Sequence, residues 1–132
     1  MNIQPLKIQI RFADLDIMGH VNNTVYFSYF EMARVYYFKQ LVGTEWNWNI
    51  NGIVIAKNEV EYIKPVLLYH EPEIYVSTEN IGTKSFTFIY ELKVEGETFA
   101  IGRSVQVCYD SVQQKPIPVP ADMRSGLEKL IN

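Results

Sequence analysis

The chain has 132 residues, of which 48% are hydrophobic and 20% are charged, so we expect one packed domain over residues 1–132 rather than a disordered chain. A net charge of −3 with scattered basic residues argues against a nucleic-acid partner. No apolar run approaches the roughly 20 residues of a membrane span. Polar residues interrupt the first ten positions, which therefore do not resemble a signal peptide, and a cytoplasmic location is expected. The single cysteine, Cys108, excludes an internal disulfide, and with only His20 and His70 beside it no Cys/His metal cluster is expected.

Alternation of apolar and polar side chains predicts a half-buried strand over residues 6–12. The apolar face of this strand comprises Leu6, Ile8, Ile10 and Phe12. A polar stretch follows over residues 13–21. Asn22 or Asn23 can then cap a helix that runs to about Gln40.

The predicted helix is apolar around nearly its whole circumference. A helix of this kind should be buried on most of its sides. Among its few charges, Glu31 and Arg34 have the i,i+3 spacing of a mutual ion pair. Gly43 can terminate the region.

From Gly52 onward the hydrophobic period changes to two, which predicts strands near residues 52–64, 72–82, 85–94 and 98–110. One face of the third strand comprises Phe86, Phe88, Tyr90 and Leu92. One face of the fourth comprises Phe99, Ile101, Val105, Val107 and Tyr109, and the other has Ala100, Gly102, Ser104 and Cys108. The small residues of that second face would let another backbone approach closely.

Turn and breaker residues separate the remaining elements. Glu95-Gly96 is a hairpin signal between the last two long strands. The strand pattern is broken by Pro116, Pro118 and Pro120, and a short amphipathic helix with Met123, Leu127 and Leu130 on its inner face is expected to follow. The order is therefore one strand, one long helix and four strands, an α+β arrangement. Either the sheet wraps around the helix or a second copy of the chain covers the rest of it, which makes a homodimer plausible.

Residues 11–26 contain the functional groups of greatest interest. Two carboxylates, a glycine, a histidine and two asparagines lie between a strand and the predicted helix. The unpaired N–H groups and the positive dipole end of a helix N-terminus suit a polarised carbonyl or a developing oxyanion. A carboxylate just upstream could act there as a nucleophile or general base. The alternative interpretation is structural, because Asp14, Asp16 and Asn22 are also ordinary loop and cap residues.

Residues 14–23 (DLDIMGHVNN), followed by Tyr26, resemble the signature of the 4-hydroxybenzoyl-CoA thioesterase family, in its acyl-CoA and acyl-ACP thioesterase branch. The likeness continues at Glu31, Ala33 and Arg34, and at residues 60–65, 82–85 and 115–118. The resemblance implies the hot-dog fold, in which an antiparallel sheet of about five strands wraps around one long helix, and pairing of chains into dimers or tetramers.

The resemblance also implies roles for individual residues. Asp16 matches the catalytic aspartate, which attacks the thioester carbonyl or activates a water, and the backbone N–H of Asn23 matches the oxyanion contact. Gly19 would let backbone approach the substrate. His20 and Asn22 would hold the loop or contact the substrate, as would their neighbour Val21. Plant-type acyl-ACP members have an asparagine two residues after the aspartate and a histidine four residues after it. This chain has Met18 at the first position and His20 at the second, so the full Asp/Asn/His set is absent, and His20 is the remaining match to a catalytic base.

Other residues have both a functional and a structural interpretation. Tyr26 and Tyr62 could line an acyl tunnel or belong to the core. Glu59 could be a second catalytic carboxylate or a strand-surface residue. Candidate contacts to coenzyme A phosphates are Lys57, Lys64, Lys84, Ser85 and Arg103, with Lys84-Ser85 preferred because Gly82 marks a turn beside it. The structural interpretation of these basic residues, which the sequence favours, is solvated surface charge. His70 is interpreted as a turn residue and Cys108 as a small buried hydrophobe.

The sequence thus predicts an acyl thioesterase that needs no cofactor, since coenzyme A is part of its substrate. Two other functions stay open. A hot-dog hydratase or dehydratase also uses an aspartate and a histidine, and it would consume an enoyl thioester without releasing thiol. A non-catalytic acyl-thioester binding module would bind without turnover. The sequence does not distinguish a fatty from an aryl acyl group, or a coenzyme A from an acyl-carrier-protein thioester.

Overall fold

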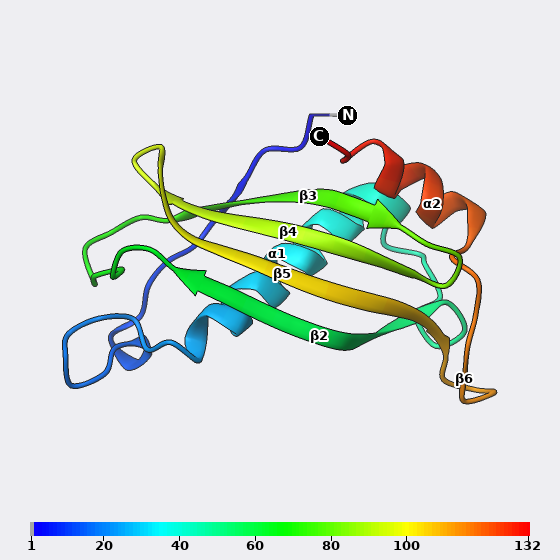
Figure 1. Ribbon diagram of the computed structural model, residues 1–132, viewed down its shortest axis with the longest axis horizontal. Coiled ribbons are helices and arrows are strands. Elements are labelled where there is room, and N and C mark those ends of the chain that lie inside the picture. Colours follow the sequence, from blue (N-terminus) through cyan, green and yellow to red (C-terminus); the bar gives the residue numbers. More distant parts are fainter. Residues whose placement is uncertain (1) are drawn as a thin grey trace.

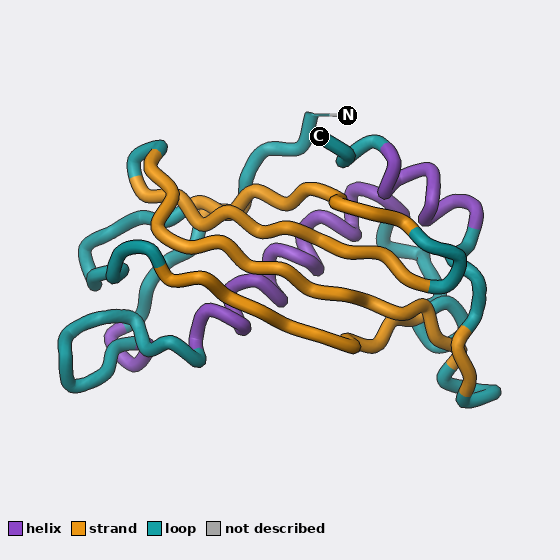
Figure 2. The backbone as a smooth tube through the Cα atoms, viewed as in Figure 1, coloured by secondary structure: helices purple, strands orange, loops and turns teal. Residues whose placement is uncertain are grey.

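The four long strands predicted from the alternation are present in the computed structural model, which describes residues 2–132 (Figure 1). They are β2 (Gly52–Tyr62), β3 (Glu73–Ile81), β4 (Ser85–Val94) and β5 (Glu97–Asp110). With β1 (Leu6–Lys7) they form an antiparallel sheet in the order β1-β3-β4-β5-β2, and β6 (Lys115–Pro116) pairs with β5. The sheet curls over the long helix α1 (Val25–Val42), which confirms the predicted α+β hot-dog architecture (Figure 2).

The first predicted strand is much shorter than expected. Only Leu6 and Lys7 pair with β3, although Ile8 and Ile10 are buried as the alternation predicts. The side chain of Phe12 is 80% exposed, so its assignment to the buried face is wrong. The reason is local: the chain leaves the extended conformation at Phe12 and forms the 3-10 helix η1 (Phe12–Asp14).

The core lies between the sheet and α1. As predicted, one face of β4 is fully buried, and its members are Phe86, Phe88, Tyr90 and Leu92. Their rings pack on helix residues, with Phe30 stacked on Tyr90 at a centroid distance of 4.8 Å. On β5, the predicted face of small residues also points toward the helix. A Cβ on Gly102 would lie 2.5 Å from the ring of Phe30, so these residues admit an aromatic side chain rather than another backbone.

The helix is covered on one face only, contrary to the expectation that it is buried on most sides. Phe27, Met32 and Val35 are 38%, 53% and 52% exposed, respectively. A single curled sheet can cover only the side of the helix that faces it, and the apolar residues of the opposite side remain open within one chain. The predicted pairing of Glu31 with Arg34 is also wrong, because Arg34 Nη1 instead donates to the Tyr90 hydroxyl at 3.2 Å.

Two further elements complete the described chain. The helix α1 ends as predicted at Gly43, whose φ of 81° and N–H bond to the Lys39 carbonyl close the last turn. The C-terminal helix α2 (Ala121–Glu128) buries Met123 and Leu127 completely, as its pattern predicted. No helix among residues 2–132 combines the length and the apolar character required to cross a membrane.

Candidate functional site

The polar segment before α1 forms a small hairpin-like loop. Leu15 and Val21 form an isolated antiparallel bridge, and the Asp16 N–H donates to the His20 carbonyl at 2.9 Å. The Gly19 N–H donates to the Asp16 carbonyl at 2.9 Å, which closes a tight turn. Gly19 has a φ of 75°, a conformation that favours glycine, so the turn itself explains why this position lacks a side chain.

The Asp16 carboxylate is held at the base of this turn. Its Oδ1 accepts a hydrogen bond from the Met18 N–H at 2.9 Å, and its Oδ2 accepts a longer one from Asn22 Nδ2 at 3.4 Å. The side chain is half-buried. Two hydrogen bonds therefore orient the carboxylate, while one side of it stays open to solvent. A substrate could reach the carboxylate from that side.

The head of helix α1 is built by Asn22 and Tyr62. The helix begins at Val25 with Thr24 as its N-cap residue, so the prediction of Asn22 or Asn23 as the cap is wrong. Asn22 instead supports the residue before the helix, because its Oδ1 accepts hydrogen bonds from the Thr24 N–H at 2.9 Å and the Thr24 hydroxyl at 2.7 Å. The Tyr62 hydroxyl donates to the Asn23 carbonyl at 2.7 Å and fixes the helix head to the end of β2. Within residues 2–132 the Asn23 N–H donates to no protein acceptor, so it is free to polarise a ligand.

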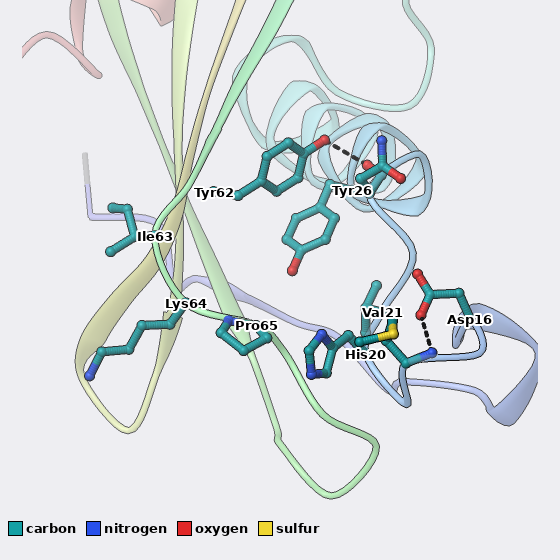
Figure 3. A pocket seen from close by; sticks show the side chains of 10 residues that line it. Asp16, His20, Val21, Tyr26, Tyr62, Ile63, Lys64 and Pro65 are labelled. Carbon is teal, nitrogen blue, oxygen red and sulfur yellow. Dashed lines mark hydrogen bonds between the residues drawn. The ribbon is translucent and has the colours of Figure 1, made fainter.

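Asp16 and the head of helix α1 at Asn23 both line one cavity of about 380 Å³ (Figure 3). Tyr26 and Tyr62 meet edge to face in its wall, with ring centroids 4.9 Å apart. Burial raises the pKa of both phenols above their ordinary value of 10.0, so both stay neutral at physiological pH. The cavity is lined by Asp16, Met18, His20, Val21, Asn23, Tyr26, Tyr62, Ile63, Lys64 and Pro65.

His20 and Lys64 lie in the wall without contacting the Asp16 carboxylate. The backbone of His20 bridges to Leu67, and no hydrogen bond joins its imidazole to Asp16 among the described residues. Lys64 forms an ion pair with Glu97 and lies 5.7 Å from the centroid of the Phe99 ring. The negative charge of Asp16 and the positive charge of Lys64 thus belong to different parts of the wall.

The other predicted phosphate contacts are not part of this cavity. Lys84 and Ser85 lie at the turn between β3 and β4, far along the sheet from the loop of Asp16 (Figure 1). Lys57 pairs with Glu59 at 3.4 Å on the exposed edge strand, and Arg103 pairs with Glu79 at 2.7 Å. His70 is a turn residue as predicted, because its Nδ1 accepts from the Leu67 N–H at 2.9 Å. Among residues 2–132, no group of three or more His, Cys, Asp or Glu side chains could hold a metal ion.

Sequence reasoning missed part of the wall and one buried charge near it. Met18, Ile63 and Pro65 line the cavity but were not proposed as site residues, although the segments that contain them, 14–23 and 60–65, both belong to the family resemblance. Asp14, interpreted as an ordinary loop residue, is only 3% exposed and accepts a hydrogen bond from the Tyr29 hydroxyl at 2.7 Å. Its proximity to Asp16 was the only available signal.

Comparison with known proteins places this geometry in a family. The family model described as "Thioesterase-like superfamily" matches residues 10–127. Escherichia coli (strain K12) long-chain acyl-CoA thioesterase FadM is 26% identical over 128 residues, covering 95% of this chain and 97% of FadM. A thioesterase from Thermus thermophilus, solved in complex with coenzyme A and Zn, is 34% identical, with a TM-score of 0.84 over 96% of this chain and 92% of that one. A predicted thioesterase from Bacillus stearothermophilus is 29% identical, with a TM-score of 0.88 over 98% and 96%.

Proposed function

Because the chain belongs to the thioesterase-like superfamily and is a thioester hydrolase, we propose that it hydrolyses acyl-coenzyme A thioesters in the cavity at the head of α1. One observation carries the proposal. Asp16 and Asn23 line the same open cavity, and the backbone N–H of Asn23 has no protein acceptor within residues 2–132. A thioester carbonyl bound there would meet a negative oxygen and a hydrogen-bond donor at once.

The chemistry follows from these two groups. The thioester oxygen accepts a hydrogen bond from the Asn23 N–H, whose position at the positive end of the α1 dipole stabilises the charge that develops on that oxygen. Asp16 attacks the carbonyl carbon or takes a proton from the water that attacks it. The carbon–sulfur bond breaks, and the products are a free acid and a thiol. Asn22 connects Asp16 to the helix head. Its side-chain nitrogen donates to the Asp16 carboxylate, its Oδ1 accepts from the Thr24 N–H, and its backbone carbonyl accepts from the Val25 N–H.

The rest of the predicted site is assigned to substrate binding. Tyr26 and Val21 form an apolar part of the wall for the acyl group, and Gly19 keeps the turn beside Asp16 tight. Lys64, at the wall, is the candidate within one chain for an anionic group of the carrier. His20 is assigned a substrate contact rather than a catalytic role, because it does not contact Asp16. Coenzyme A as the carrier is supported by the FadM name and by the coenzyme A complex of the Thermus protein.

The assembly that we propose is a homodimer. β2 is an edge strand of the described sheet path, and the side chains of Val54 and Ile55 on it are 43% and 37% exposed. The uncovered face of α1, with Met32 and Val35, lies on the same molecule. A second copy would cover both, since an exposed apolar edge strand pairs readily with another strand. Lys84 and Ser85, remote from the cavity of their own chain, are proposed to reach a substrate only across such an assembly.

The test is a thiol-release assay on Asp16→Asn with acyl-CoAs of several chain lengths, an aryl-CoA and one acyl-carrier-protein thioester. Loss of a carboxylate that acts as nucleophile or base should lower kcat/KM by about 10²–10⁴. Asp122→Asn, an exposed carboxylate in the first turn of α2, is the matched control and should keep full activity. Unchanged kcat/KM in Asp16→Asn would refute the assignment. If an enoyl thioester lost its absorbance without releasing thiol, the result would indicate a hydratase. If a thioester bound without turnover, the result would indicate a binding module.

A further inference from the structure

A buried charge near the site has no part in the proposed chemistry. The side chain of Asp14 is 3% exposed and does not line the cavity, although Asp14 lies only two residues before Asp16. Its carboxylate accepts three hydrogen bonds. Oδ2 accepts from the Tyr29 hydroxyl at 2.7 Å and from the Arg11 N–H at 3.0 Å, and Oδ1 accepts from Arg11 Nη2 at 3.1 Å. Burial of a carboxylate is unfavourable unless hydrogen-bond donors compensate it, and these three hydrogen bonds provide that compensation.

These contacts join three parts of the molecule at one residue. The Arg11 contacts belong to the segment that enters the loop, and Tyr29 is a buried residue of α1. The carbonyl of Asp14 also accepts from the Asn22 N–H at 2.9 Å, which fixes the second arm of the loop. Among the hydrogen bonds of the described chain, the Tyr29–Asp14 bond is the one that ties the first arm, which carries Asp16, to α1.

The spacing turns this bond into a geometric constraint. Asp16 follows Asp14 by two residues. Asn23 lies two residues before Val25, the first residue of α1, and Tyr29 lies about one helical turn after Val25. The hydroxyl–carboxylate contact therefore closes the segment from Asp14 to Tyr29 into a loop, and this loop contains both the Asp16 carboxylate and the backbone N–H of Asn23. A change in that contact alters the separation of the two groups that must act on one carbonyl.

We propose that Asp14 and Tyr29 are a pair of positioning residues that set the distance between the Asp16 carboxylate and the Asn23 amide, and so control the rate of thioester hydrolysis rather than substrate binding. This inference rests on the function proposed above. Neither residue touches the substrate, and both act through the loop and the helix head.

The electrostatics of the pair support the geometry. Burial alone raises the pKa of Asp14, but the hydrogen bonds from Tyr29 and Arg11 and the charge of Arg11 outweigh it and hold the pKa below the ordinary 3.8. Burial and the neighbouring carboxylate raise the pKa of Tyr29 well above 10.0. The pair is therefore an ionised acceptor with a neutral donor near neutral pH. A hydrogen bond of this kind is short and stronger than a neutral one.

The test is Tyr29→Phe, which keeps the buried ring and removes only the hydroxyl. We expect kcat to fall about 10- to 100-fold with KM changed less than twofold, because a misplacement of about 1 Å can cost roughly 10² in rate. Tyr37→Phe is the matched control. Tyr37 is equally buried on the same helix, nearer its C-terminal end and away from the loop of Asp16. Loss of the Tyr37 hydroxyl should lower the melting temperature similarly and leave kcat unchanged.

Variants of the acceptor provide a second, independent readout. Asp14→Asn keeps an oxygen that can accept from Tyr29, whereas Asp14→Ala keeps none, so kcat should decrease in the order wild type, Asp14→Asn, Asp14→Ala. Arg11→Ala removes only the partner on the solvent side, where the Arg11 side chain is 77% exposed, and should keep its kcat. If Tyr29→Phe does not fold, the order of the Asp14 variants decides the question.

Two patterns would overturn the inference. In the first, Tyr29→Phe and Tyr37→Phe lose stability alike and both keep the wild-type kcat. In the second, the Tyr29→Phe and Asp14 variants raise KM at constant kcat. These results are distinct from a failure of the proposed function, which would appear as full activity in Asp16→Asn. An inactive Asp16→Asn beside a fully active Tyr29→Phe would leave the function in place and remove only the positioning role.

Discussion

Replacement of Gly102 by alanine tests whether the contact between sheet and helix is as tight as the structure indicates. A Cβ at this position would lie 2.5, 2.8 and 3.1 Å from three carbons of the Phe30 ring. Carbon atoms in good contact are about 3.5–4.0 Å apart, so the ring would have to retreat by about 1 Å. The ring has little room to shift, because Phe30 is also stacked on Tyr90, the cross-strand partner of Gly102, with an interplanar angle of 17°.

The expected change in the free energy of unfolding for Gly102→Ala is the sum of two opposing effects. Overpacking of a filled core costs about 1–3 kcal/mol in the free energy of unfolding. Replacing glycine by alanine also restricts the unfolded chain, which returns about 0.4–1 kcal/mol. The net loss expected for Gly102→Ala is therefore about 1–2 kcal/mol. For a chain of this size that corresponds to a fall of about 4–10 °C in melting temperature.

A double-mutant cycle with Phe30→Leu isolates the clash from other effects. Thermal and denaturant unfolding of the two single variants and of the double variant would give the coupling energy between the positions. Leucine lacks the ring edge that meets the new methyl group, so Gly102→Ala should cost less in the Phe30→Leu background, with a coupling of about 1 kcal/mol. Additive losses, or a Gly102→Ala protein as stable as the wild type, would contradict this account of the contact.

Two further predictions concern stability at high pH and assembly. Burial raises the pKa of the Cys108 thiol from 9.0 to about 11, so its contribution to stability is complete below pH 9 and is lost as pH rises from 9 to 11, by up to about 3 kcal/mol. Denaturant unfolding at pH 8 and pH 10.5 should show a smaller loss for Cys108→Ala than for the wild type, and identical losses would contradict the assignment. Light scattering after size exclusion should give about twice the 15.4 kDa of one chain, with Val35→Glu shifted toward the monomer, and a wild type that is monomeric at tens of micromolar would contradict the proposed dimer.

The predictable part of the fold is the part determined by local periodicity. The alternation over β4 identified the face that meets the helix, because a period of two leaves this strand only one way to bury its large residues. On β5 the alternation separated the two faces, and the face with the small residues is the one that meets the helix. The same alternation failed at Phe12, where the chain turns after Ile10 and the pattern continues by coincidence. For α1, an apolar pattern around the whole circumference indicated burial but could not indicate that the covering surface is missing from the chain itself.

For the candidate site, too, the residues that are close in sequence could be predicted, whereas the residues that the sheet brings in from elsewhere could not. Asp16 and Asn23 could be proposed together because a loop of six residues separates them and allows a carboxylate to reach the following helix head, and the family resemblance named the same two positions. Tyr62 and Lys64 join them only because β2 ends beside that helix head, a contact that is set by the order of strands in the sheet. Nothing in the local sequence specifies it.

The contact between Asp14 and Tyr29 shows why such a residue escapes sequence analysis. Its carboxylate is conspicuous only after α1 has packed against the loop, since before folding it is one of two similar acids in a polar turn. Folding then separates their environments: Asp14 acquires three donors and is buried, whereas Asp16 keeps one side open to the cavity. A buried carboxylate that accepts three hydrogen bonds is suited to holding a structure, and one with an open side is suited to meeting a substrate. The different roles that we propose for the two acids therefore depend on the packed helix and not on the DLD sequence that contains them both.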